Sequence, residues 1–233
     1  MKYIDIDDSL KNKIDEMRKH IRKSYEFEKV KKLFLEIHAA LHVSEVSGNK
    51  KPNEIDALFE DLQLHEFKTV PSPKDETIAW AVWHLARIED MTMNILVNQG
   101  EQIFNKKWQE RLNAPFTDTG VAMSGDEIIK LSNELNTAEL LVYRNTVGKR
   151  TREIVTGLVA DDMKRKVSPE GLNKIRSEGG TCANSEWLLE YWGKKDVAGI
   201  LLMPPTRHLM MHLNDCMKWK QRMRTENKIF NNT

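Results

Sequence analysis

The main candidates for chemistry in this 233-residue chain are two histidines one helical turn apart. His208 and His212 lie four positions apart, and the apolar spacing after Pro204-Pro205 predicts a helix over 205–224. Residues i and i+4 share a face of a helix, so both imidazoles could bind one metal ion. Their face is the apolar one, which turns the rings toward the protein interior. It consists of Pro205, His208, Met211, His212, Asp215, Cys216, Trp219 and Met223.

A third histidine lies in another apolar segment, where the spacing predicts a helix over 75–98. The inward face of that helix consists of Trp80, His84, Ile88, Met91 and Ile95. An inward single imidazole and an inward pair can meet between adjacent helices. The sequence therefore predicts a metal site of His84, His208 and His212, with positions left for water or substrate. The alternative is that they are core histidines hydrogen-bonded to carbonyls or to Asp215.

Groups around such a site must orient the imidazoles. Asp215 follows His212 by three residues and is the first candidate, with Glu89 and Asp90 as weaker ones. Three tryptophans could wall the site or simply belong to the core: Trp80, Trp83 and Trp219.

A second histidine pair has a similar spacing. His38 and His42 lie four apart, and Glu45 follows three residues later, within a helix predicted over 27–47. Imidazoles and a carboxylate at these positions form a legitimate metal pattern. However, the apolar stripe of this helix runs through Leu33, Ile37 and Leu41, and His42 lies off its centre. This placement favours a non-metal role, with His38 as a polar group that reaches the interior.

Charge and cysteine content narrow the function classes. Lys and Arg total 36 against 35 Asp and Glu, a net charge of +1, so we expect no nucleic-acid partner. Two cysteines, Cys182 and Cys216, cannot form a disulfide framework and fit a cytoplasmic protein. The first ten residues do not resemble a signal peptide, and the longest apolar run, 197–203, is too short for a membrane span.

The elements that position these residues are predicted to be helices, because no segment shows the alternation of apolar and polar residues that is typical of a strand. Helices are predicted over about 7–24, 27–47, 52–64, 75–98, 101–112, 124–157 and 205–224. Ser124 and Glu127 form a capping box at the start of one of them. Four long helices with short connectors favour an antiparallel bundle. The segment 159–203 is long for a connection, so we expect it to carry short helices or to build a pocket.

The residues around the three histidines are similar to a known family. The segment Ile78-Ala-Trp-Ala-Val-Trp-His84-Leu-Ala-Arg-Ile-Glu-Asp resembles the second helix of the DinB-like (YfiT-like) metalloenzymes, whose His-Leu-Ala-type sequence supplies the first ligand. The segment His208-x-x-x-His212 resembles the last helix of the same bundle, which supplies the other two. The resemblance covers roughly residues 27–225.

The resemblance implies a single all-α domain over residues 1–233, a DinB-like four-helix bundle. An N-terminal helical extension would occupy 1–26 and the bundle 27–225, with 159–203 as a long crossover before the last helix. His84, His208 and His212 would hold a divalent metal, nickel or zinc in the first place and iron in the second. Members often form homodimers.

The function implied is a metal-dependent transferase or hydrolase acting on a small molecule. Characterised relatives are thiol-dependent S-transferases or isomerases, so a low-molecular-weight thiol is the expected co-substrate. The alternative, from another class, is a non-catalytic, stress-associated helical protein that binds through its pocket or surface.

Overall fold

A computed structural model describes the backbone of residues 8–230 and the side chains of residues 8–225. Over these residues the protein is all-helical and has no strand, apart from one isolated bridge between Lys166 and Asp196. The all-α, DinB-like fold class predicted from the sequence is confirmed.

The helices follow one another along the chain with short connections. The first half contains α1 (Asp8–His20), η1 (Ser24–Glu26), α2 (Phe27–Ala40), α3 (Ser44–Ser47), α4 (Glu54–Glu60), α5 (Leu64–Lys68), α6 (Ile78–Asp90), η2 (Met91–Val97) and α7 (Lys106–Leu112). The second half contains α8 (Gly125–Glu134), α9 (Thr137–Gly157), η3 (Ala160–Lys164), α10 (Pro169–Ser177), η4 (Ala183–Ser185), α11 (Trp187–Gly193), α12 (Val197–Leu201), η5 (Met203–His208) and α13 (Leu209–Phe230).

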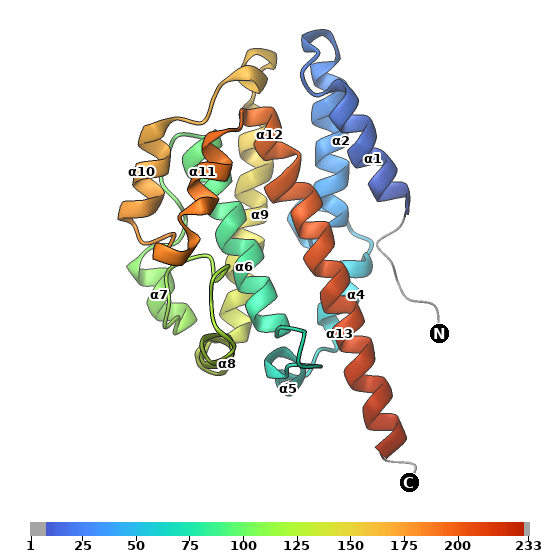
Figure 1. The fold of residues 1–233 in the computed structure, drawn as a ribbon. Coiled ribbons are helices and arrows are strands. Elements are labelled where there is room, and N and C mark those ends of the chain that lie inside the picture. The colour runs from blue at the N-terminus through green and yellow to red at the C-terminus, as the bar shows by residue number, and fades with distance from the viewer. Residues whose placement is uncertain (1–7, 231–233) are drawn as a thin grey trace.

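Four of the longer helices, α2, α6, α9 and α13, form the central bundle (Figure 1). Helix α6 packs against both α9 and α13, and α2 packs against α9 and against η5. Helix α1 lies along α2, because Leu10, Ile14 and Met17 recur at four- and three-residue spacing and form its buried stripe. The short helices α7, α8, α10 and α11 lie on the other side of the bundle from α1 (Figure 1).

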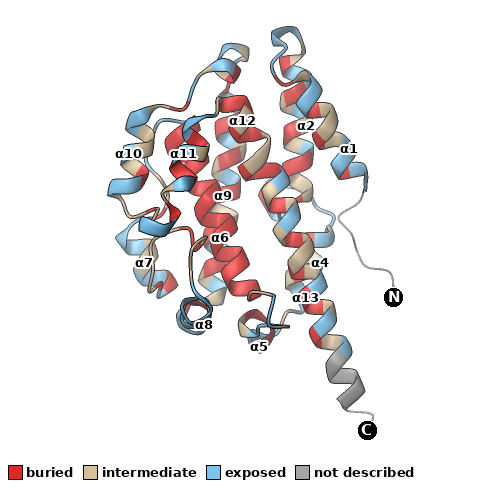
Figure 2. Ribbon diagram, in the orientation of Figure 1, coloured by how far each residue is buried: buried red, intermediate tan, exposed pale blue. Residues whose placement is uncertain are grey.

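Helix α6 is the centre of the fold. Its central residues, 80–86, are apolar apart from His84, and every residue from Ile78 to Val97, through α6 and the π-helical η2, is buried (Figure 2). Thr77 caps the start, and its hydroxyl accepts a hydrogen bond from the backbone N–H of Trp80 at 3.0 Å. A helix that is buried on all sides forms the interior of a bundle.

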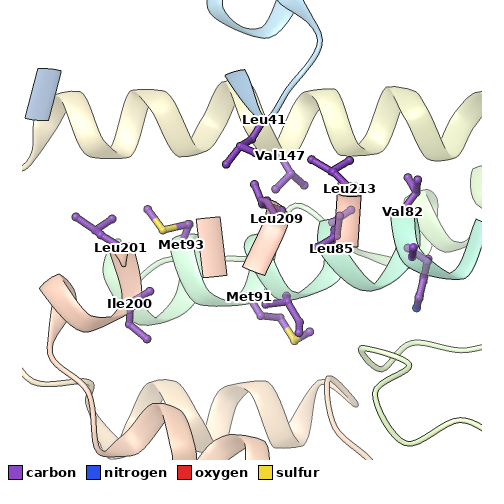
Figure 3. Packing of buried hydrophobic residues seen from close by; sticks show 14 of the residues in the cluster. Leu41, Val82, Leu85, Met91, Met93, Val147, Ile200, Leu201, Leu209 and Leu213 are labelled. Carbon is purple, nitrogen blue, oxygen red and sulfur yellow. The ribbon is translucent and has the colours of Figure 1, made fainter. Parts of the chain in front are cut away.

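Side chains from several helices meet around α6 in the core (Figure 3). The residues that meet there are Val82 and Leu85 of α6, Met91 and Met93 of η2, Val147 of α9, Leu41 after α2, Ile200 and Leu201 of α12, and Leu209 and Leu213 of α13. None of the described helices is both long enough and apolar enough to cross a membrane.

Two of the predicted helices differ from the structure. In each, the helix ends or divides at a point where the apolar spacing of the sequence continues. The helix predicted over 27–47 stops at Ala40, and α3 is separate from it. The helix predicted over 124–157 is two helices, because Leu135 is extended (ψ 134°) and the Asn136 side chain caps α9 by accepting from the N–H of Glu139. The crossover 159–203 carries short helices, as expected.

Candidate metal centre

Three imidazoles converge between α6 and the start of α13. His84 comes from the middle of α6, His208 ends η5, and His212 lies in the first turn of α13. One ring nitrogen from each lies within 4.8 Å of the others, so a single point is within about 2.8 Å of all three. Metal–nitrogen bonds are about 2.1 Å long, so small shifts of the rings would complete a common site. The structure therefore brings together the three histidines that the sequence analysis grouped.

A backbone carbonyl fixes the orientation of His84. Its Nδ1 lies 2.7 Å from the carbonyl oxygen of Thr119, and a carbonyl can only accept a hydrogen bond. The ring proton of the neutral imidazole must then be on Nδ1, which leaves the lone pair on Nε2. That atom lies 3.1 Å from Nε2 of His208, on the side where the three rings meet. His84 is thus held in the tautomer that can bind a cation at Nε2.

The loop that supplies this carbonyl is held by one face of α6. Each residue from 117 to 120 accepts, through its carbonyl, a hydrogen bond from an α6 side chain. The donors are Trp80 to Gly120 (3.0 Å), Trp83 to Asp118 (3.0 Å), His84 to Thr119 (2.7 Å) and Arg87 to Thr117 (2.9 Å). Positions spaced by three and four share a face, so a single helical stripe anchors the loop. Sequence reasoning missed this partner of His84, because a backbone carbonyl has no residue-type signal.

Burial keeps the three imidazoles neutral. It lowers the pKa of His84 from 6.5 to about 3, with a further contribution from the charge of His212. Burial, together with the charges of His84 and His212, lowers the pKa of His208 well below 6.5. The pKa of His212 is also lowered by burial. Near neutral pH all three rings can offer a lone pair to a cation without first losing a proton.

Trp80, predicted to wall the site, contacts two of the three rings. Its indole stacks on His84 with ring centroids 4.9 Å apart and an interplanar angle of 8°, and it meets the ring of His212 edge-on at 5.8 Å. Trp219 is buried in the core, about 10 Å along the axis of α13 from His212, at 1.5 Å per residue. Trp80 is therefore the better-placed wall residue of the two.

Asp215, predicted to orient the imidazoles, lies toward solvent. Its side chain is 44% exposed and pairs with Lys218 at 3.7 Å. Its negative charge raises the pKa of His212 and so partly offsets the lowering caused by burial. Asp215 thus acts on the site through its charge, and orientation of an imidazole comes from the Thr119 carbonyl instead. Asp215 lies toward solvent because the buried face of α13 is rotated toward Leu209 and Leu213. Met211, which the spacing also placed on the inward face, is 46% exposed for the same reason.

The donor set fits a divalent cation. Three neutral nitrogens leave at least one coordination position of a four-coordinate ion for water or substrate, which is typical of catalytic rather than structural sites. His84 is buried, whereas His208 and His212 are half-buried, so the site has an accessible side. The Nδ1 atom of His208 is buried and has no hydrogen-bond partner within the described part of the chain, which leaves it free to take the ring proton when Nε2 binds.

The second histidine pair also finds a carboxylate, but a different one. Glu45, predicted to join His38 and His42, is exposed and pairs with Lys149 at 2.5 Å. The carboxylate that meets both imidazoles is Glu89 of α6. His42, which lies off the centre of the apolar stripe in the sequence, is nevertheless fully buried, in the turn after α2. Only the packing of α2 on its neighbours reveals that partner.

Asp90, the other weak candidate for the three-histidine site, serves a separate network. Its carboxylate accepts hydrogen bonds from the backbone N–H groups of Ile103 and Phe104, both at 2.9 Å, and from the Tyr143 hydroxyl at 2.6 Å. Asp90 therefore anchors the chain after η2 to α9.

Comparison with known proteins agrees with this fold. A family model described as the DinB superfamily matches residues 49–216, a stretch that contains His84, His208 and His212. No curated protein matched the chain. The bundle boundaries predicted from the sequence, 27–225, extend beyond the matched residues at both ends. Because the match covers well over half of the chain, the chain belongs to the DinB superfamily.

Proposed function

We propose that this protein is a metal-dependent enzyme, a transferase or hydrolase that acts on a small molecule at a divalent cation held by His84, His208 and His212. The observation that carries the proposal is the convergence of three neutral imidazoles at a site with one accessible side. A divalent ion with three neutral ligands keeps its full charge and lowers the pKa of a bound water or thiol. Nickel and zinc are the proposed ions, with iron as the next choice, because imidazole suits all three.

The residues of the chain have distinct tasks in this proposal. The Thr119 carbonyl holds the proton of His84 on Nδ1, so that Nε2 stays free for the cation. Trp80 covers the face of His84 and the edge of His212, which excludes water from that side of the rings. Substrate enters from the side on which His208 and His212 are half-buried. A low-molecular-weight thiol is the co-substrate that we propose, since a thiol bound as thiolate is a nucleophile at neutral pH.

Metal content tests the site. The wild-type chain, purified without a nickel column, should take up nickel, zinc or iron, and His212→Ala should lose at least one equivalent per chain. Met211→Ala is the matched control, because Met211 is the exposed neighbour of His212 and should leave the metal content unchanged. A wild-type chain that takes up none of the three ions on titration would contradict the proposal.

Turnover tests the activity. The metal-loaded chain should accelerate conjugation of small thiols to an electrophile such as an aryl chloride, or hydrolysis of a small ester, and His212→Ala should lose this activity while Met211→Ala retains it. Metal retained without turnover in either assay would favour the non-catalytic binding protein instead.

A further inference from the structure

A second constellation of two imidazoles and a carboxylate lies deeper in the bundle. His38 in α2 and His42 in the turn after it are 0% exposed, and Glu89 of α6 is 1% exposed. Nε2 of His38 lies 2.9 Å from one oxygen of Glu89, and Nε2 of His42 lies 3.2 Å from the other. The two rings stack with centroids 4.2 Å apart. Three potential ligand atoms thus converge in the protein interior, within 4.8 Å of one another.

Among the described residues, the Glu89 carboxylate pairs with the two imidazoles and with no Lys or Arg side chain. A buried negative charge is costly unless a positive charge compensates it.

Arg144 is a buried cation that interacts electrostatically with Glu89, but its hydrogen bond goes elsewhere. Its guanidinium donates to the carbonyl of Leu41 at 2.6 Å, while its Nε and one terminal nitrogen have no partner among the described residues. Arg144 therefore acts on Glu89 through space and does not occupy the point between the carboxylate and the two rings.

Helix α9 is shaped to admit the imidazole of His42. Gly148 lies in the middle of this helix, where glycine costs about 1 kcal/mol relative to alanine. A Cβ at this position would lie 2.6 Å from Nδ1 and 2.7 Å from Cε1 of the His42 ring. The glycine provides the space in which the ring can point its Nε2 at Glu89.

We propose that His38, His42 and Glu89 form a second site for a divalent transition-metal ion. Two imidazole nitrogens and one carboxylate oxygen suit iron(II), zinc, cobalt or manganese, whereas magnesium and calcium prefer oxygen ligands. Each imidazole faces a different oxygen of Glu89, and one ligand atom from each of the three residues lies within 4.8 Å of the other two, so a single point is within about 2.8 Å of all three.

This site is distinct from the three-histidine centre and adjacent to it. Glu89 follows His84 by five residues of α6, a rise of about 7.5 Å along the helix axis. The charge of Glu89 also raises the pKa of His208 and partly offsets the effect of burial. His38 and His42 precede the residues that match the family model, 49–216, so the second site draws on a part of the chain outside the match.

Cobalt(II) titration of the full chain, followed by metal analysis after desalting, tests the second site. Because the site is fully buried, each variant is refolded from urea in the presence of Co²⁺. The wild type should bind two equivalents, Glu89→Gln one, His208→Ala/His212→Ala one, and the triple variant none. Glu89→Gln keeps the shape of the side chain and removes its charge, and circular dichroism checks that each variant is folded.

The two proposals fail in different ways in this experiment. If Glu89→Gln binds as much cobalt as the wild type, the second site is wrong and the trio is a metal-free hydrogen-bonded array, while the three-histidine site stands. If only Glu89→Gln loses metal, the three-histidine site is wrong and the second site stands.

A pair of glycine variants adds an independent check. Gly148→Ala should weaken cobalt binding at the second site at least tenfold, because its Cβ displaces the His42 ring. Gly157→Ala, in the same helix but facing open space, should have no effect. Equal binding by both variants would contradict the role assigned to His42.

Discussion

At His84, a single hydrogen bond decides which ring nitrogen can meet a cation. The Thr119 carbonyl holds the proton on Nδ1, and the loop that carries this carbonyl is itself held by the tryptophans and the arginine on the same face of α6. Partners of this kind commonly change metal affinity by 10- to 100-fold when they are removed. The geometry of the site therefore depends on residues that never contact the ion.

Trp80→Phe tests this dependence. The substitution keeps an aromatic ring against His84 but removes the N–H that donates to the Gly120 carbonyl, so the loop around Thr119 loosens. We expect about a tenfold loss of zinc affinity at the three-histidine site, measured by competition with a chromophoric chelator. Trp187→Phe, at an exposed tryptophan, is the control and should bind like the wild type. Equal affinities for the two variants would show that the indole N–H does not support the site.

At the scale of elements, the long helices and the inward face of the histidine pair could be predicted from apolar spacing alone. Spacing failed where a polar cap interrupts an apolar pattern, as at Asn136, which begins α9 although the pattern runs on from α8. It also failed for the partner of His38 and His42, because Glu89 reaches them from another helix. Contacts between helices that are distant in sequence depend on how the helices pack, and the apolar spacing within one helix does not predict them.

Lys220 shows how one element fixes another. Lys220 is only 9% exposed, and its ammonium group donates to the carbonyls of Ala57 and Leu58 and to Asp61, so a residue of α13 caps the C-terminal end of α4. Lys220→Met should lower the free energy of unfolding by about 1–3 kcal/mol, because these buried carbonyls lose their donor.

The matched control lies two residues away. Lys218 is 49% exposed and makes only a 3.7 Å contact with Asp215, so Lys218→Met should change the free energy of unfolding by less than about 0.5 kcal/mol. Urea unfolding followed by circular dichroism measures both variants. Losses of equal size would mean that Lys220 does not hold α4 in place.

At the scale of the whole molecule, the buried histidines make folding sensitive to mild acid. The pKa values of His84 and His42 are about 3 in the folded chain and 6.5 ordinarily. Below pH 6.5 the unfolded chain therefore binds protons that the folded chain does not, and the stability of the fold decreases as the pH falls. Each of these histidines should cost about 2 kcal/mol between pH 7 and pH 5.

The measurement is the urea midpoint of the metal-free chain, kept in a chelator, at several pH values between 7 and 5. Most carboxylates stay ionised over this range, so the slope reports mainly on histidines. His84→Gln should flatten the slope, whereas His65→Ala, at an exposed histidine, should leave it unchanged. A wild-type midpoint that does not move between pH 7 and pH 5 would contradict the neutral, buried state of these rings.

The burial of α6 on every side has a consequence for how the molecule opens. Amide protons of a helix with no solvent-facing side exchange with solvent mainly when the whole domain unfolds, whereas those of the peripheral helices exchange through local fraying. Residues 78–97 should therefore include the slowest-exchanging amides of the chain. Because the same helix supplies His84 to one constellation and Glu89 to the other, its exchange rate gives a single readout of the integrity of both.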